Sequence, residues 1–124
     1  MRFAKIVFRV AGIWGVLIIT PLYFMFDLIG RKDPPPITHP GFFYGFVGVA
    51  LAWQIAFFCI ATDPPRYRLL MIPSVLEKLS YGAAVAVLVL HGRMHGSDLV
   101  FAGTDLLLGV LFVIAYFKTP PRAV

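Results

Sequence analysis

Asp105 is the side chain best placed to carry chemistry, because its carboxylate lies inside an apolar stretch that runs from about residue 99 to 117. A charged side chain that faces lipid is costly, so this carboxylate is expected to face other helices or a watery cavity. In a structural role, Asp105 would hydrogen-bond to Thr104, a tyrosine or a backbone carbonyl and lock helix packing. In a functional role, it would transfer protons or bind a ligand, as ionisable groups inside membranes often do. The sequence leaves both roles open.

Other polar side chains fall toward the same predicted end of the protein as Asp105, namely Asp27, His39, His91 and Asp98. We predict that these residues line a small pocket that opens on the non-cytoplasmic side. Asp105 would be its polar anchor, and Asp27 could face the same vestibule. A pocket of this kind would bind a lipid, a quinone or another small apolar ligand, or would handle protons.

His91 and His95 are four residues apart and Asp98 follows three residues later, so a continuous helix would place all three on one face. Such spacing can hold a metal ion, and His39 together with His91 could ligate a haem from two sides. The glycine that follows each of His91 and His95 instead indicates an irregular, solvated turn. We therefore predict no metal site and no particular cofactor; His91 and His95 are the metal candidates.

Small residues recur at helical spacing on one face of the second apolar stretch: Gly41, Gly45, Gly48, Ala52, Ala56 and Cys59. Small side chains let a neighbouring helix approach closely, so this face is predicted to be a packing face. Cys59 is then a small buried residue rather than a nucleophile. As the single cysteine, it excludes an intramolecular disulfide and a CxxC redox pair. Gly109, on the same helix face as Asp105, is also expected to lie in a packing contact.

The composition indicates a membrane protein. The chain of 124 residues is 60% hydrophobic and 14% charged, against roughly 45–50% and about 25% in soluble domains. A chain this short cannot hide so much apolar surface in a core of its own, so most of it must face lipid. The net charge of +5 is carried by scattered basic residues without interleaved aromatics, which argues against a nucleic-acid partner.

Four apolar stretches, each close to the roughly 20 residues that cross a bilayer, predict an all-α, polytopic four-helix bundle that forms one domain. The expected helices span residues 10–29, 42–61, 74–91 and 99–117. Pro21 is expected to kink the first helix.

Glu77 and Lys78 interrupt the third apolar stretch. Ser74 followed by Glu77 predicts a capping box, in which each side chain satisfies a backbone amide at the start of the helix. Both charges would then lie at the membrane interface, with Lys78 extended toward the lipid headgroups.

Basic residues are distributed unevenly over the two sides of this topology, with eight on one side and three on the other. The side with eight contains both termini and the second loop, and the positive-inside rule assigns it to the cytoplasm. In the absence of an organelle address, a bacterial inner membrane is the expected location.

Three stretches resemble small uncharacterised bacterial membrane proteins with four helices: His39 to Trp53, Asp63 to Arg68 together with Glu77 and Lys78, and Asp105 to Gly109. More loosely, the chain is similar to the DoxX-like superfamily, some of whose members are small subunits of quinone-linked oxidoreductases. That similarity rests on size, helix count and glycine-rich helices. It implies a redox-associated role and no catalytic residues.

No complete catalytic or cofactor motif is present, so the leading hypothesis is a non-catalytic accessory or interaction subunit rather than an enzyme. Its expected partners are the lipid bilayer and either a second copy of the chain or another membrane protein. The alternatives are the pocket anchored by Asp105 and the redox-associated subunit.

Overall fold

The computed structural model describes residues 2–32, 36–92 and 99–121, and every regular element in them is helical. The α-helices are α1 (Arg2–Ile19), α2 (Phe26–Lys32), α3 (Pro40–Thr62), α4 (Met71–Leu90) and α5 (Leu99–Lys118), with the 3-10 helices η1 (Thr20–Phe24) and η2 (Arg68–Leu70). Four helical segments are long and apolar enough to cross a membrane: Arg2–Phe24, Pro40–Thr62, Arg68–Leu90 and Leu99–Lys118. The prediction of an all-helical protein with four such segments is confirmed.

Two helices begin three or more residues before their predicted starts. α1 begins at Arg2 rather than near residue 10, because Ala4, Phe8 and Ala11 already face the core one helical turn apart. α4 begins at Met71 rather than at Ser74. In α1, packing extends the helix beyond the apolar run that was used to place its start. In α4, the helix begins two residues before Pro73, and therefore before the capping box that was expected to start it.

Pro21 interrupts the first helix, as predicted. The backbone changes from α-helix to the 3-10 helix η1 at Thr20, and the short helix α2 follows after Met25. A proline has no amide hydrogen to donate and its ring clashes with the preceding turn, so the regular helix cannot continue through it.

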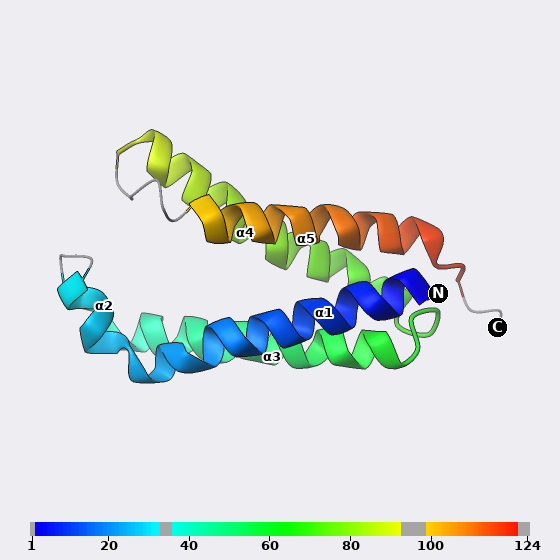
Figure 1. The fold of residues 1–124 in the computed structure, drawn as a ribbon, viewed down its shortest axis with the longest axis horizontal. Helices are drawn as coiled ribbons and strands as arrows, with labels where there is room; N and C mark the ends of the chain where they lie inside the picture. Colours follow the sequence, from blue (N-terminus) through cyan, green and yellow to red (C-terminus); the bar gives the residue numbers. More distant parts are fainter. Residues whose placement is uncertain (1, 33–35, 93–98, 122–124) are drawn as a thin grey trace.

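The four long helices form two hairpins (Figure 1). α1 packs against α3 and α4 packs against α5, while the two hairpins meet mainly along α1 and α5. α3 and α4 barely touch each other. Both ends of the chain lie at the end of the bundle where the hairpins converge, and the hairpins diverge toward the opposite end. The arrangement resembles a V.

The core fills the convergent end of the V. Three phenylalanines from three helices form its centre: the rings of Phe8 and Phe112 are stacked with centroids 4.2 Å apart, and the Phe57 ring lies 5.0 Å from that of Phe112. All three side chains are fully buried. Aromatic pairs at these distances add to the stabilisation that burial already provides. Among the described residues, the two hairpins are therefore held together mainly at this end (Figure 1).

Arg68 closes the convergent end. Its Nε donates hydrogen bonds to the carbonyl oxygens of Thr119, at 2.7 Å, and Tyr116, at 3.2 Å. Its guanidinium lies 3.8 Å from the centroid of the Tyr116 ring. Cations are favourable at a helix C-terminus, where the last carbonyls lack helical partners. Arg68 thus ties the start of α4 to the end of α5.

Candidate functional site

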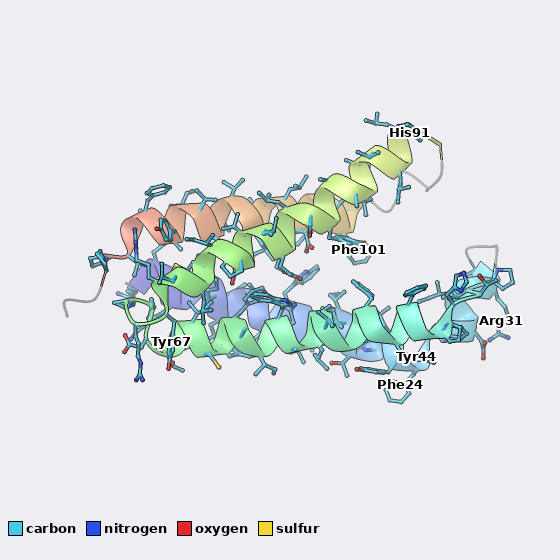
Figure 2. All side chains as sticks on the ribbon, turned by 180° about the vertical axis from the view of Figure 1, so that it is seen from behind. Phe24, Arg31, Tyr44, Tyr67, His91 and Phe101 are labelled. Carbon is cyan, nitrogen blue, oxygen red and sulfur yellow. The ribbon has the colours of Figure 1, made fainter. Side chains whose placement is uncertain are left out.

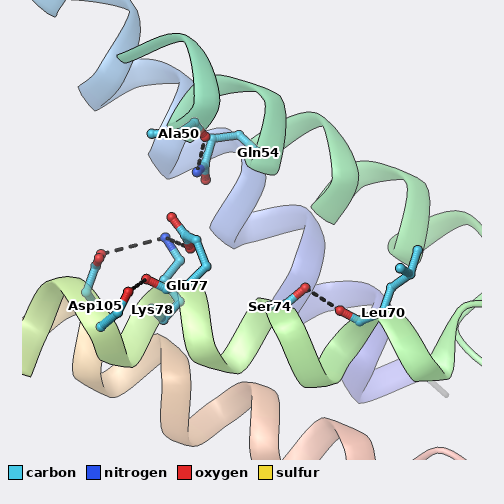
Figure 3. A network of polar contacts seen from close by, with 8 residues as sticks. Ala50, Gln54, Leu70, Ser74, Glu77, Lys78 and Asp105 are labelled. Carbon is cyan, nitrogen blue, oxygen red and sulfur yellow. Dashed lines mark hydrogen bonds and ion pairs between the residues drawn. The ribbon is translucent and has the colours of Figure 1, made fainter. Parts of the chain in front are cut away.

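A buried ion-pair cluster joins α4 and α5 where the hairpins begin to diverge. Lys78 Nζ lies 3.6 Å from Asp105 Oδ1 and 3.7 Å from Glu77 Oε2. The Lys78 side chain is only 3% exposed, and those of Glu77 and Asp105 are 20% and 17% exposed. We call Glu77, Lys78 and Asp105 the charged triad (Figure 3).

The prediction that Lys78 extends to the headgroups is wrong. Lys78 lies ten residues after Arg68, or about 15 Å along a helix. Asp105 lies 14 residues before Thr119, or about 21 Å. Arg68 and Thr119 are hydrogen-bonded at the same end of the bundle, so both members of the pair lie toward the middle of the two membrane-length helices and not at their ends. Lys78 points toward the interior of the bundle because it pairs there with the Asp105 carboxylate of α5.

The predicted capping box is also absent. α4 starts at Met71, so Ser74 lies inside the helix, and its Oγ donates a hydrogen bond to the carbonyl of Leu70 at 2.7 Å. Glu77 is consequently not engaged at the start of the helix. Its side chain reaches into the space between α3 and α4 instead (Figure 3).

The charges of the triad do not cancel completely. With all three groups ionised, the triad carries one positive and two negative charges. Both ion-pair distances exceed the roughly 2.7–3.2 Å of a good hydrogen bond. No described residue donates a hydrogen bond to Glu77 Oε2, which is buried. Beneath the triad, the Phe57 ring lies 5.2 Å from Lys78 Nζ, a position at which an aromatic face stabilises a cation.

Gln54 of α3 approaches the triad from the other hairpin. Its side chain is fully buried, and Nε2 donates a hydrogen bond to the Ala50 carbonyl at 2.8 Å. Its Oε1 has no hydrogen-bond donor among the described residues. Figure 3 shows the Gln54 amide and the Glu77 carboxylate on facing sides of the space between α3 and α4. Two buried acceptors without donors therefore lie across this space from each other.

Gln54 can pack between α1 and α3 because residue 15 of α1 is a glycine, which has no side chain in its way. A Cβ at Gly15 would overlap the Gln54 side-chain amide, so any larger residue would displace Gln54 or separate α1 from α3. A second close approach, at Gly109, lies beside the triad: a Cβ there would be 2.8 Å from Leu79 Cδ2 and 3.5 Å from Lys78 Cβ. Glycines thus set the positions of the helices that carry the polar groups.

A cavity of about 250 Å³ lies between the hairpins, and the charged triad forms one end of it. We call it the triad cavity. It is lined from all four long segments by Trp14, Gly15, Ile18, Ile19, Leu22, Phe46, Ala50, Glu77, Lys78, Tyr81, Phe101 and Asp105. Apart from the triad and the Tyr81 hydroxyl, this lining is apolar or aromatic. Phe101 points from α5 toward the other hairpin (Figure 2).

A second hollow of about 510 Å³ adjoins the triad cavity on the side where α3 and α4 barely touch. The two share Phe46, Ala50, Glu77 and Tyr81 as lining residues. Glu77 therefore borders both spaces. The second hollow extends the triad cavity toward the surface of the membrane-spanning region.

Three of the other predicted pocket residues, Asp27, His39 and His91, do not line the triad cavity with Asp105. Asp27 is exposed and lines a separate hollow with Phe26, Gly30, Arg31, Pro36 and Ile37. His39 and His91 are both exposed, and they belong to different hairpins, because His39 directly precedes α3 and His91 directly follows α4. His91 lies at the end where the hairpins diverge (Figure 2). Asp98 and His95 lie outside the described residues. The expectation that Asp27 shares a vestibule with Asp105 is wrong, because α2 follows the break at Pro21 and carries Asp27 away from the bundle.

The small-residue face of α3 makes few contacts with the other helices, and its Gly45 borders the second hollow. A Cβ at Gly41 or Gly45 would meet nothing within 4 Å, and one at Gly48 would be 3.4 Å from the Tyr23 hydroxyl. Ala52 is exposed and Ala56 is partly exposed. Within this chain, Val47, Ala50, Gln54 and Phe57 form the packed face instead. Cys59 is exposed, so its expected burial is wrong.

Three polar residues of the site, Glu77, Lys78 and Gln54, were not predicted. The sequence did contain a signal for Lys78. A carboxylate in the middle of one apolar helix is expected to pair with a cation near the middle of another. Lys78 lies near the middle of its helix when residues are counted from Arg68, at the end of the bundle where the hairpins converge. Gln54 is the single amide side chain in the uncharged run of α3. A single amide side chain in an uncharged apolar helix, like a charged one, marks a position that is expected to face the interior of the bundle.

Within the described residues, no group of three or more histidine, cysteine, aspartate or glutamate side chains is placed to hold a metal ion. The resemblance to DoxX-like and other small four-helix membrane proteins stays a prediction. Comparisons of the chain with protein-family models, curated proteins and solved structures found no match.

Proposed function

We propose that this protein binds a small amphipathic molecule in the triad cavity, with the apolar part of the molecule between the hairpins and its polar part at Glu77, Lys78 and Asp105. The observation that carries the proposal is the cavity itself. An otherwise apolar space between the hairpins is bordered by three ionisable side chains, of which Lys78 is buried and Glu77 and Asp105 are partly buried. Ligand sites commonly combine an apolar wall with a few convergent polar groups.

The size of the site fits this role. The triad cavity, about 250 Å³, lies just below the roughly 300–1,000 Å³ of typical ligand pockets. The adjoining hollow provides further room past Gly45, Val49 and Trp53. A short amphipathic molecule can therefore fill the cavity, and a longer one can extend its tail between α3 and α4.

The distribution of charges at the two ends supports an outward-facing site. The hairpins converge where the basic termini and the second loop lie, and they diverge at the opposite end. If the basic end is cytoplasmic, as the positive-inside rule implies, the wide end of the V faces out of the cell. Both termini would then be in the cytoplasm of a bacterial inner membrane.

Native mass spectrometry of the protein extracted gently from its own membrane tests the proposal. We expect a reproducible added mass on the wild-type protein that is reduced or lost in Asp105→Asn. Asp27→Asn is the matched control, since it makes the same change in a different hollow and should retain the added mass. A wild-type protein that carries nothing beyond its own mass under these conditions would contradict the proposal.

Folding of the Asp105→Asn variant needs its own measurement, because Asp105 also pairs with Lys78. Helical content and thermal unfolding of the variant should remain close to those of the wild type. Loss of the added mass together with loss of folding would assign Asp105 to packing rather than to binding.

A second role, as a non-catalytic accessory subunit, is favoured by the small-residue face of α3. Gly41, Gly45 and Ala52 leave a surface on which a helix of another chain could pack closely. Disulfide crosslinking of Gly45→Cys in a Cys59→Ser background tests it. A crosslinked dimer in native membranes is expected, with Val113→Cys on α5 as the control that should not crosslink. The redox-associated role implied by the DoxX-like resemblance is a third possibility; it predicts that the added mass is a quinone.

A further inference from the structure

The polar end of the triad cavity contains more hydrogen-bond acceptors than donors. Glu77 Oε2 and Gln54 Oε1 are both buried and accept no hydrogen bond from any described residue. Of the two, Glu77 lines the cavity, whereas Gln54 is fully buried behind the lining residues Gly15 and Ala50. Buried acceptors without donors are costly, so a bound group that donates hydrogen bonds would be stabilised here.

The charge of the site points to the same chemistry. With all three groups ionised, one ammonium group faces two carboxylates, and the triad then has an excess negative charge in surroundings of low polarity, where electrostatic interactions are strong. A neutral alcohol could donate one hydrogen bond without balancing that charge. A carboxylate ligand would bring a further negative charge next to Glu77 and Asp105. An ammonium group supplies both the donors and the missing positive charge.

The remaining lining residues of the cavity indicate the chemical nature of the part of the ligand beyond its polar group. Trp14, Phe46 and Phe101 give the walls aromatic faces, and Ile18 and Leu22 complete the apolar surface. Nothing among these side chains would pair with a second charge on the ligand. This part of the ligand is therefore an apolar chain or ring.

From these observations, we infer that the ligand of the triad cavity is a lipophilic amine whose ammonium group donates a hydrogen bond to Glu77 Oε2. This inference rests on the proposed function, since it names the chemical class bound at the same site. Lys78 keeps its place beside Asp105, and the amine pairs with the carboxylate of Glu77.

The chain contains its own reporter for the test. It has two tryptophans, of which Trp14 lines the triad cavity and Trp53 lines the adjoining hollow. In a Trp53→Phe protein held in lipid nanodiscs, fluorescence therefore reports on Trp14. Octylamine, octanol and octanoate are the probes, because they share one apolar chain and differ in the head group.

Octylamine should change the Trp14 emission saturably and bind at least about tenfold more tightly than octanol or octanoate, as expected for a charge-assisted hydrogen bond. Glu77→Gln, which keeps the shape of the side chain, should weaken the binding of octylamine about tenfold or more. Glu77→Asp should recover part of the affinity. Asp27→Asn is the control and should leave it unchanged.

The outcomes separate the inference from the proposed function. If octanol or octanoate binds saturably and as tightly as octylamine, and Glu77→Gln does not change this binding, the inference that the ligand is an amine is contradicted. The proposal that the cavity binds an amphipathic molecule would still hold. Failure of all three probes to bind, together with bare protein in the mass spectrometer, would overturn both. Equal loss of helical content in Glu77→Gln and Glu77→Asp would make Glu77 a structural residue and would also overturn the inference.

Discussion

Lys78 of α4 and Asp105 of α5 form an ion pair, with 3.6 Å between Nζ and Oδ1, inside a hairpin that is apolar enough to cross a membrane. The pair does two things at once. It fixes the register of α4 against α5, and it places charge at the end of a cavity between the hairpins. A buried pair is not strong evidence for stability, since its two charges must first be removed from water. Its position at the cavity is the better reason to regard it as functional.

Removing the cation should be strongly destabilising. Lys78→Met leaves the Glu77 and Asp105 carboxylates without a counter-charge, and breaking a buried pair in this way costs about 3–5 kcal/mol. The measurement is the free energy of unfolding in mixed micelles. Lys5→Met, at an exposed position of α1, is the control and should change stability little.

Coupling between Lys78 and Asp105 should be visible in a double-mutant cycle. The combined variant Lys78→Met with Asp105→Asn should lose less stability than the sum of the two single variants, by about 0.5–3 kcal/mol. Strict additivity of the two losses would show that the two side chains do not interact in the folded protein.

Gly15→Ala should destabilise the α1–α3 hairpin by about 1–3 kcal/mol, because the new methyl group would overlap the Gln54 amide. Gly103→Ala is the matched change, since a Cβ there meets nothing within 4 Å. Alanine favours a helix by up to about 1 kcal/mol over glycine, so that variant should be as stable as the wild type or more so. Thermal unfolding of both variants distinguishes the two effects.

The Gly15→Ala variant should be rescued by a second change. Gln54→Ala removes the side chain that the new methyl group would strike, so the double variant should unfold at a higher temperature than Gly15→Ala alone. If Gln54→Ala instead adds its own loss in full, Gly15 and Gln54 are not in contact.

Arg68→Gln should loosen the convergent end of the bundle. It removes a charged donor to the carbonyls of Thr119 and Tyr116, and hydrogen bonds from charged groups contribute about 1.5–3 kcal/mol each. Faster hydrogen exchange in the last turn of α5 is the expected local signature. Arg66→Gln, at an exposed neighbouring position, should leave exchange in that turn unchanged.

Reporter fusions should place both ends of the chain in the cytoplasm. A phosphatase fused after residue 124 should be inactive and a fluorescent protein there should be bright, because the basic residues gather at the end of the bundle that contains both termini. An active phosphatase fused at that position would reverse the orientation. It would also turn the wide end of the V toward the cytoplasm.

The sequence by itself determined the fold class, the four spans and the interruption at Pro21. Apolar runs of near-bilayer length and a proline without an amide donor act within one helix at a time, so no knowledge of the neighbouring helices is needed. The same local signals also identified Asp105, whose charge stands out against its own helix.

Only the tertiary structure decided which groups surround Asp105. Lys78 was taken for an interfacial residue and Glu77 for a helix cap, because each was judged against its own helix and not against α5. Whether a small residue faces a neighbour or the lipid depends on how the helix is rotated: Gly15 and Gly109 pack closely, while Gly41 and Gly45 meet nothing. Rotation and pairing are set by contacts between helices distant in sequence, and the composition of a single span does not encode them.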